Sequence, residues 1–182
     1  MPSKASRLTV SCDDLDRIGA CYAACEWFQR VLNGRPNILM SELLHLVADA
    51  VSGIDWIMWA IEDEYNGRTG ELFPELVKQW FNANQADCLN TYNKAIHDPS
   101  GQIEEAAQAM RTLHAKWYSV LDHQIAGSLP SNSAEEQQAK AAYTQMYHVH
   151  SYLITNARND YITSLRDVVH NMAYRVASGD FD

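Results

Sequence analysis

Apolar residues recur every three or four positions in at least five segments of this chain, which is the period of an α-helix. No segment alternates between apolar and polar residues as a half-buried strand does. Residues 131–178 contain neither Gly nor Pro, the two residues that most strongly interrupt helices. We therefore predict an all-α protein, a compact bundle of about six to eight helices.

Capping signals and loops that contain Gly or Pro divide this pattern into separate helices. Ser11 with Asp14, and Ser133 with Glu136, have the spacing of capping boxes at helix starts. Residues 54–61 are apolar on almost every side, so we predict that this segment is the centre of the core. The expected helical segments are 11–18, 20–32, 41–51, 54–61, 74–97, 102–126 and 133–176.

The last segment is too long for one straight helix inside a compact domain. At roughly 1.5 Å per residue it would extend about 65 Å, against about 40 Å for the diameter of such a domain. Its apolar stripe, from Ala142 to Val176, has a mean spacing above about 3.6 residues, which does not favour a left-handed coiled coil. We predict a break near residues 155–160, where polar residues cluster.

Three parts are expected along the chain. Residues 1–10 read as a flexible N-terminus, 11–97 as an N-terminal helical module, and 102–177 as C-terminal helices packed with the module as one domain. The sequence Asp98-Pro99-Ser100-Gly101 between them is the clearest break in the pattern.

Composition and the absence of targeting signals lead us to expect a protein with a hydrophobic core that is located in a cytoplasm. Of 182 residues, 47% are hydrophobic, yet no apolar run approaches the roughly 20 residues that span a bilayer. The basic N-terminus is not followed by the apolar stretch of a secretory signal. The four cysteines lie in helical patterns, where reduced Cys packs as a small apolar residue. We expect a cytoplasmic protein that does not bind membranes.

The charge of −9, from 14 basic and 23 acidic residues, disfavours direct binding to nucleic acid because no basic patch is present. The opposite possibility is an acidic mimic of DNA. Most acidic clusters stand at predicted helix N-termini, where they complement the helix dipole. The cluster Glu62, Asp63 and Glu64 stands near a helix C-terminus instead, so these three residues are candidate binding residues.

Two carboxylate-x-x-His pairs could hold metal ions in a helical bundle: Glu42 with His45, and Asp167 with His170. On a helical wheel both pairs face away from the apolar side of their helix, whereas a metal site in a bundle core needs inward ligands. A di-metal enzyme is therefore only an alternative. Phosphate-binding, nucleophile-elbow and zinc-protease motifs are absent, so we expect no catalytic residues and no cofactor.

The final segment carries more Tyr than one apolar stripe requires: Tyr143, Tyr147, Tyr152 and Tyr161. Tyr is favoured where a surface is apolar but still in contact with water, as at protein interfaces. We take these four residues as candidates for a surface that binds a protein partner. If the protein forms a homodimer, we expect it to use these C-terminal helices.

Residues 18–21 (Ile-Gly-Ala-Cys), Trp27-Phe28 and residues 55–59 (Asp-Trp-Ile-Met-Trp) occur in this order within the first 65 residues. This block resembles a small helical module of phage and prophage accessory proteins of unassigned function. The resemblance implies a scaffold on which a variable helical part carries specificity, in the cytoplasm of the host. Together with the absence of a catalytic motif, it leads us to expect a non-enzymatic protein that binds, and inhibits or modulates, a host or defence protein, as anti-CRISPR proteins do.

Overall fold

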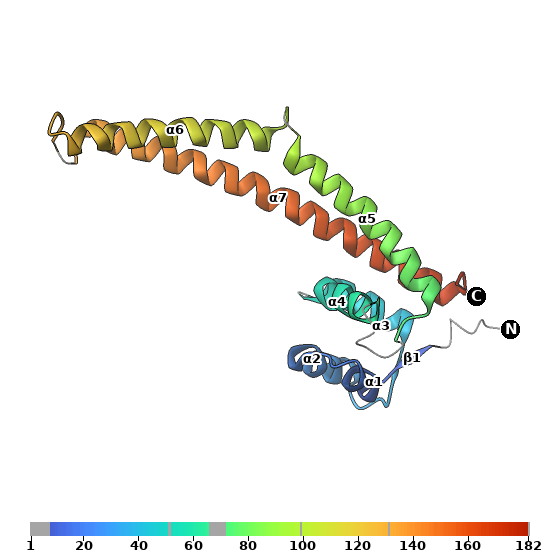
Figure 1. Ribbon diagram of the computed structural model, residues 1–182. Helices are drawn as coiled ribbons and strands as arrows, with labels where there is room; N and C mark the ends of the chain where they lie inside the picture. The colour runs from blue at the N-terminus through green and yellow to red at the C-terminus, as the bar shows by residue number, and fades with distance from the viewer. Residues whose placement is uncertain (1–7, 51, 66–71, 99, 131, 182) are drawn as a thin grey trace. The chain divides into compact units, whose positions relative to one another are not determined.

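The computed structural model describes residues 8–50, 52–65, 72–98, 100–130 and 132–181, without the side chains of residues 62–65 (Figure 1). The predicted all-α class is confirmed, since helices make up most of this described chain. The helices are α1 (Cys12–Arg17), α2 (Tyr22–Leu32), α3 (Met40–Asp49), α4 (Gly53–Tyr65), α5 (Glu75–His97), α6 (Gln102–Ile125) and α7 (Ala134–Ser178). Two short strands, β1 (Thr9–Val10) and β2 (Ile38–Leu39), pair antiparallel.

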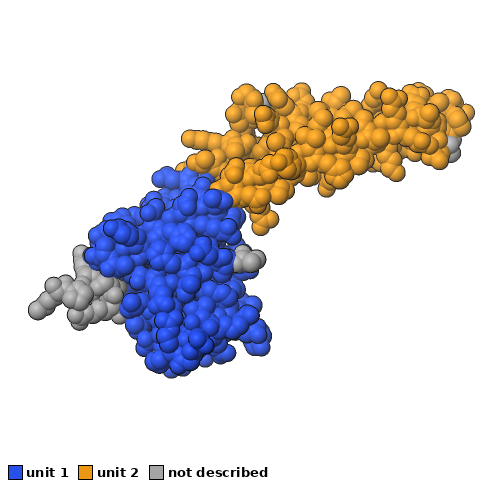
Figure 2. Space-filling view, turned by 180° about the vertical axis from the view of Figure 1, so that it is seen from behind, with its two compact units in different colours: residues 1–88, 162–182 blue, residues 89–161 orange. Residues whose placement is uncertain are grey.

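The chain divides into two compact units (Figure 2). Unit 1 comprises residues 1–88 and 162–182, and unit 2 comprises residues 89–161. The unit boundaries therefore lie inside α5 and α7, and the predicted division at residues 98–101 falls between α5 and α6 in the chain, within unit 2. Of the predicted flexible N-terminus, residues 1–7 lie outside the described residues, and Thr9 and Val10 form β1.

Unit 1 contains the well-packed core. Among the described residues, all the largest fully buried side chains belong to it. They come from its N-terminal strands and helices, from the start of α5 and from the end of α7, so segments distant in sequence share one core. These side chains are Val10, Phe28, Ile38, Met40, Leu44, Ile61, Val77, Phe81, Leu165, Val169, Met172 and Val176.

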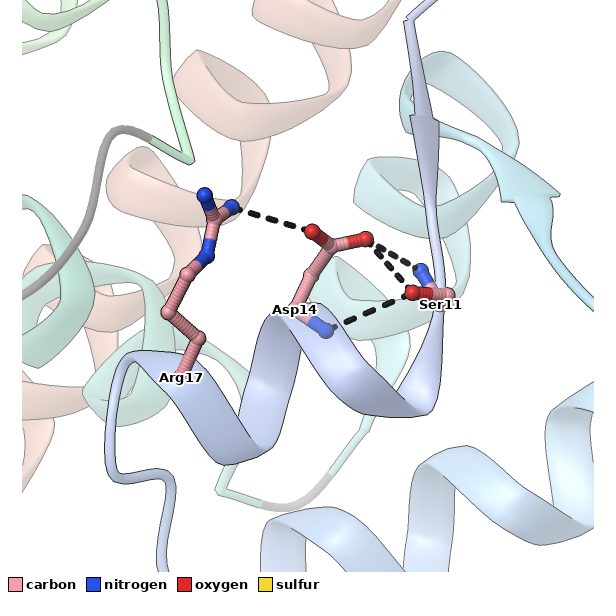
Figure 3. A network of polar contacts seen from close by, with 3 residues as sticks. All are labelled: Ser11, Asp14 and Arg17. Carbon is pink, nitrogen blue, oxygen red and sulfur yellow. Dashed lines mark hydrogen bonds and ion pairs between the residues drawn. The ribbon is translucent and has the colours of Figure 1, made fainter.

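The predicted capping box at Ser11 is confirmed (Figure 3). The Asp14 N–H donates to Ser11 Oγ at 3.3 Å, and the Ser11 N–H donates to Asp14 Oδ2 at 2.9 Å. Arg17 pairs with the other carboxylate oxygen of Asp14 at 3.0 Å. Burial acts to raise the pKa of Asp14, but the bonds from Ser11 and the charge of Arg17 outweigh it and lower the pKa. The box therefore fixes the start of α1 directly after β1.

Only half of the second predicted capping box forms. The Glu136 N–H donates to Ser133 Oγ at 3.2 Å, as the motif requires. The Glu136 carboxylate does not return to Ser133, because it accepts from the Asn132 N–H at 2.9 Å and from Gln124 Nε2 at 2.7 Å. Glu136 thus links the start of α7 to the end of α6.

The predicted break at residues 155–160 is wrong, because α7 runs without interruption from Ala134 to Ser178. The prediction assumed one compact domain whose diameter limits the helix, whereas α7 extends through two units. The polar residues there also fit a helix. Thr155 Oγ1 donates to the Ser151 carbonyl at 2.8 Å, and Asn159 is exposed, while neither residue type costs more than about 0.7 kcal/mol in a helix.

The segment predicted as the centre of the core is only partly buried. Ile57, Ala60 and Ile61 of α4 are buried, as expected. Trp56 and Trp59, on the other side of the same helix, keep part of their surface accessible. An apolar helix in unit 1 therefore leaves two large aromatic side chains incompletely covered.

Candidate protein-binding surface

Unit 2 contains a helical hairpin, formed by α6 and the first part of α7, which lie side by side (Figure 1). The described residues 126–130, 132 and 133 lie between the two helices in the chain. Among the described residues of unit 2, only four apolar side chains are buried, and three of them are alanines: Ala106, Ala107, Ala139 and Val120. Small side chains let the two helices approach closely but bury little apolar area.

The large apolar side chains of the hairpin stay partly accessible, because each of two paired helices can cover the other on one side only. Half-buried residues of this kind occur along the length of both helices. They are Met110, Leu113, Trp117, Leu121, Tyr143, Met146 and Leu153. The hairpin thus presents apolar surface that unit 2 does not bury by itself.

An aromatic cluster of His114, Trp117, Tyr118, Tyr143 and Tyr147 joins α6 to α7. The Trp117 and Tyr143 rings stack with centroids 5.6 Å apart and an angle of 28° between their planes. His114 lies 5.1 Å from Tyr143 and 4.5 Å from Tyr118, and Tyr147 lies 6.4 Å from Tyr143. The cluster orders these rings, yet Tyr118 and Tyr147 remain 52% and 49% exposed.

Charged residues are scarce around this cluster. Lys140 is the only one in the 21 residues from Gln137 to Ala157, and Lys116 is the only one from Thr112 to Leu121. The centres of protein interfaces are depleted of charge and enriched in Tyr and Trp, whereas a helical surface facing only water is usually rich in charge. The composition around the cluster therefore resembles that of an interface centre.

The structure brings together two of the four predicted tyrosines. Tyr143 and Tyr147 are one helical turn apart in the cluster, but Tyr152, nine residues after Tyr143, points to the opposite side of α7. Tyr152 is 66% exposed, so it is available on a different face. Tyr161 is half-buried and stacks on Tyr92 of α5 with centroids 5.2 Å apart.

The cluster also contains three residues of α6 that the sequence analysis did not single out. His114, Trp117 and Tyr118 are spaced i, i+3 and i+4, which places all three on one side of a helix. That spacing was visible in the sequence. Its pairing with Tyr143 and Tyr147 was not, since it depends on the register between α6 and α7.

The four residues of the alternative di-metal site do not all converge. Glu42 pairs with Arg35 at 3.0 Å, while Asp167 is exposed. His45 and His170 do meet, with their Nδ1 atoms 2.9 Å apart, and Asp49 faces the other nitrogen of His170 at 3.3 Å. Within the part of the chain that is described, no group of three or more His, Cys, Asp or Glu side chains could hold a metal ion. The two His rings instead hydrogen-bond each other, which joins α3 to the end of α7.

The candidate acidic residues Glu62, Asp63 and Glu64 lie in α4, and their side chains fall outside the described residues. No described helix combines the length and the apolar character needed to cross a bilayer. Comparisons with protein-family models, with curated proteins and with solved structures find no match to this chain.

Proposed function

We propose that the protein acts by binding another protein through the aromatic cluster of the hairpin, without catalysis. The observation that carries this proposal is the combination of exposed aromatic rings and scarce charge around the cluster, on a hairpin whose own buried residues are nearly all alanine. Trp and Tyr in such positions supply much of the binding free energy at protein interfaces. A partner seated on the cluster would bury the parts of Tyr118 and Tyr147 that water now contacts.

The partner is best described as a foreign protein with a largely uncharged, apolar face. Between residues 89 and 161 there are seven acidic and five basic residues, so unit 2 carries only a small share of the charge of −9. An acidic mimic of DNA would instead concentrate its negative charge on the binding surface. Complementarity here is therefore apolar, and binding should depend little on salt.

The resemblance to phage accessory proteins adds a biological setting to this proposal. In that setting the protein inhibits or modulates a host or defence protein, and it does so in the host cytoplasm. The four free cysteines are compatible with a reducing compartment of this kind.

The test compares two Tyr→Glu substitutions on exposed positions of α7. Tyr147→Glu places a charge in the aromatic cluster, and Tyr174→Glu places the same charge on a side chain that is 69% exposed in unit 1. A photo-crosslinking amino acid at position 118 of the otherwise unchanged protein first identifies the partner in the source cells. Calorimetry with the purified partner then measures the affinity of each variant.

We expect Tyr147→Glu to weaken binding by at least about tenfold, as for a residue near the centre of an interface, and Tyr174→Glu to leave it unchanged. Light scattering of the purified protein tests for self-association through the same face. If Tyr147→Glu abolishes a homodimer but leaves binding to a foreign protein unchanged, the partner of the cluster is a second copy of this chain. If the partner binds the wild type, Tyr147→Glu and Tyr174→Glu with equal affinity, the assignment of the binding surface to the aromatic cluster is refuted.

A further inference from the structure

Unit 1 has a pocket of about 410 Å³. Its walls come from the turn between α1 and α2, from α3 and α4, and from residues 72–73. Pockets that hold small molecules have volumes of roughly 300–1,000 Å³ and are lined mainly by apolar and aromatic side chains, with a few polar groups. This pocket meets that description, because Ile18, Leu43, Leu44 and Ile57 are among the residues that line it.

The aromatic part of the lining explains why α4 is not fully covered. Trp56 and Trp59 both line the pocket, together with Phe73. Trp27 supports the Trp56 ring from α2, with ring centroids 5.5 Å apart and planes inclined by 52°. The Trp56 ring is therefore held by a contact with Trp27, and part of the surface of both indoles stays accessible to a ligand.

One charged group lies beside these rings. Among the described residues that line the pocket, Asp55 is the only charged one, and its exposed carboxylate has no hydrogen bond or ion pair to another described residue. Asp55 lies in the first turn of α4, where a negative charge interacts favourably with the helix dipole. The dipole explains the acidic residue, but it does not explain the apolar pocket beside it. A carboxylate and indole faces both attract cations, and the net charge of −9 favours cations further.

We propose that the pocket binds a small organic cation, namely an ammonium group attached to an aromatic or aliphatic body. The ammonium group lies at Asp55, and the body fills the apolar space against Trp56 and Trp59. This site is in unit 1, so the proposal is independent of protein binding by the hairpin of unit 2.

Three ligands with the same body and different charge test the proposal on the full-length protein: phenylpropylamine, phenylpropanol and phenylpropionate. Isothermal titration calorimetry should give the tightest binding for the amine, weaker binding for the alcohol and the weakest for the carboxylate. We expect the amine to be favoured over the alcohol by roughly fivefold, the effect of one charge pair at about 4 Å in a well-solvated site. Added salt should reduce this preference.

Substitutions identify the group responsible for the preference. Asp55→Asn should bind the amine and the alcohol equally, with alcohol binding retained. Asp13→Asn is the matched control, because Asp13 is also an exposed residue in the first turn of a helix but does not line the pocket. The control should keep the preference for the amine.

A second readout locates the ligand. The exposed Cys21 lines the pocket, so the amine should slow alkylation of Cys21 while leaving alkylation of Cys12 unchanged. Absence of saturable binding at roughly millimolar amine would overturn the proposal. The proposal would also be overturned if phenylpropionate bound as tightly as the amine, or if the preference for the amine over the alcohol survived Asp55→Asn. Binding of the amine without slower alkylation of Cys21 would overturn it as well.

Discussion

Substitution of Met172 tests whether the end of α7 is part of the same core as the N-terminal helices. Met172 has no accessible surface, and Met172→Ala removes three buried side-chain atoms. At about 0.8 kcal/mol per buried group, the loss of burial alone costs roughly 2.4 kcal/mol. The cavity that remains raises the expected loss to about 3 kcal/mol, within the range of about 2–5 kcal/mol for such changes.

Urea unfolding followed by tryptophan fluorescence measures this loss. Four of the five tryptophans, Trp27, Trp56, Trp59 and Trp80, lie in unit 1 and report on its core. With a slope of about 2 kcal/mol per molar urea, the midpoint should fall by roughly 1.5 M. Tyr174→Ala, two residues further along α7 at a 69% exposed position, should change stability by no more than about 0.5 kcal/mol. If the two variants unfold at the same urea concentration, the shared core is refuted.

Three further predictions concern the helices and the cysteines. Asn159→Pro should cost about 3 kcal/mol and lower the far-ultraviolet circular dichroism, whereas Asn159→Ala should not; equal spectra would contradict a continuous α7. Ser11→Ala should cost about 1 kcal/mol at neutral pH. Folding lowers the pKa of Asp14. Asp14 therefore contributes its full stabilisation above the ordinary pKa of 3.8, and this stabilisation is lost as the pH falls through the pKa of the folded state. The urea midpoints of wild type and Ser11→Ala should therefore converge in acid. Cys21 is exposed, while burial, with the Asp16 charge, raises the pKa of the Cys25 thiol. Peptide mass spectrometry should therefore find iodoacetamide on Cys21 before Cys25, and the reverse order would contradict this exposure.

The helices and their ends could be predicted because the signals for them are local. The capping box of Ser11 acts over three residues, and Asn33, which adopts a left-handed conformation with φ 46°, ends α2 where the sequence Asn33-Gly34 predicts. The strands were not predicted, because they have no such local signal. Each has two residues, too few to alternate, and the pair Val10–Ile38 forms only when distant segments meet.

The candidate site was predictable only in part. Tyr143 and Tyr147 follow from the helical period, but their contacts with Trp117 depend on how α6 and α7 pair. The wheel correctly placed His45 on the outer side of its helix, yet it could not show that His170 meets it from 125 residues away.

The sequence by itself determined which segments are helical and where most of these helices begin and end, because backbone hydrogen bonds, caps and side-chain spacing act within a few residues. Tertiary structure decided that α7 continues through residues 155–160, that Trp56 and Trp59 line a pocket, and which aromatic rings of the hairpin cluster. These outcomes depend on which helical faces meet. That choice is made by apolar contacts between segments far apart in the chain, whose energies no local pattern contains.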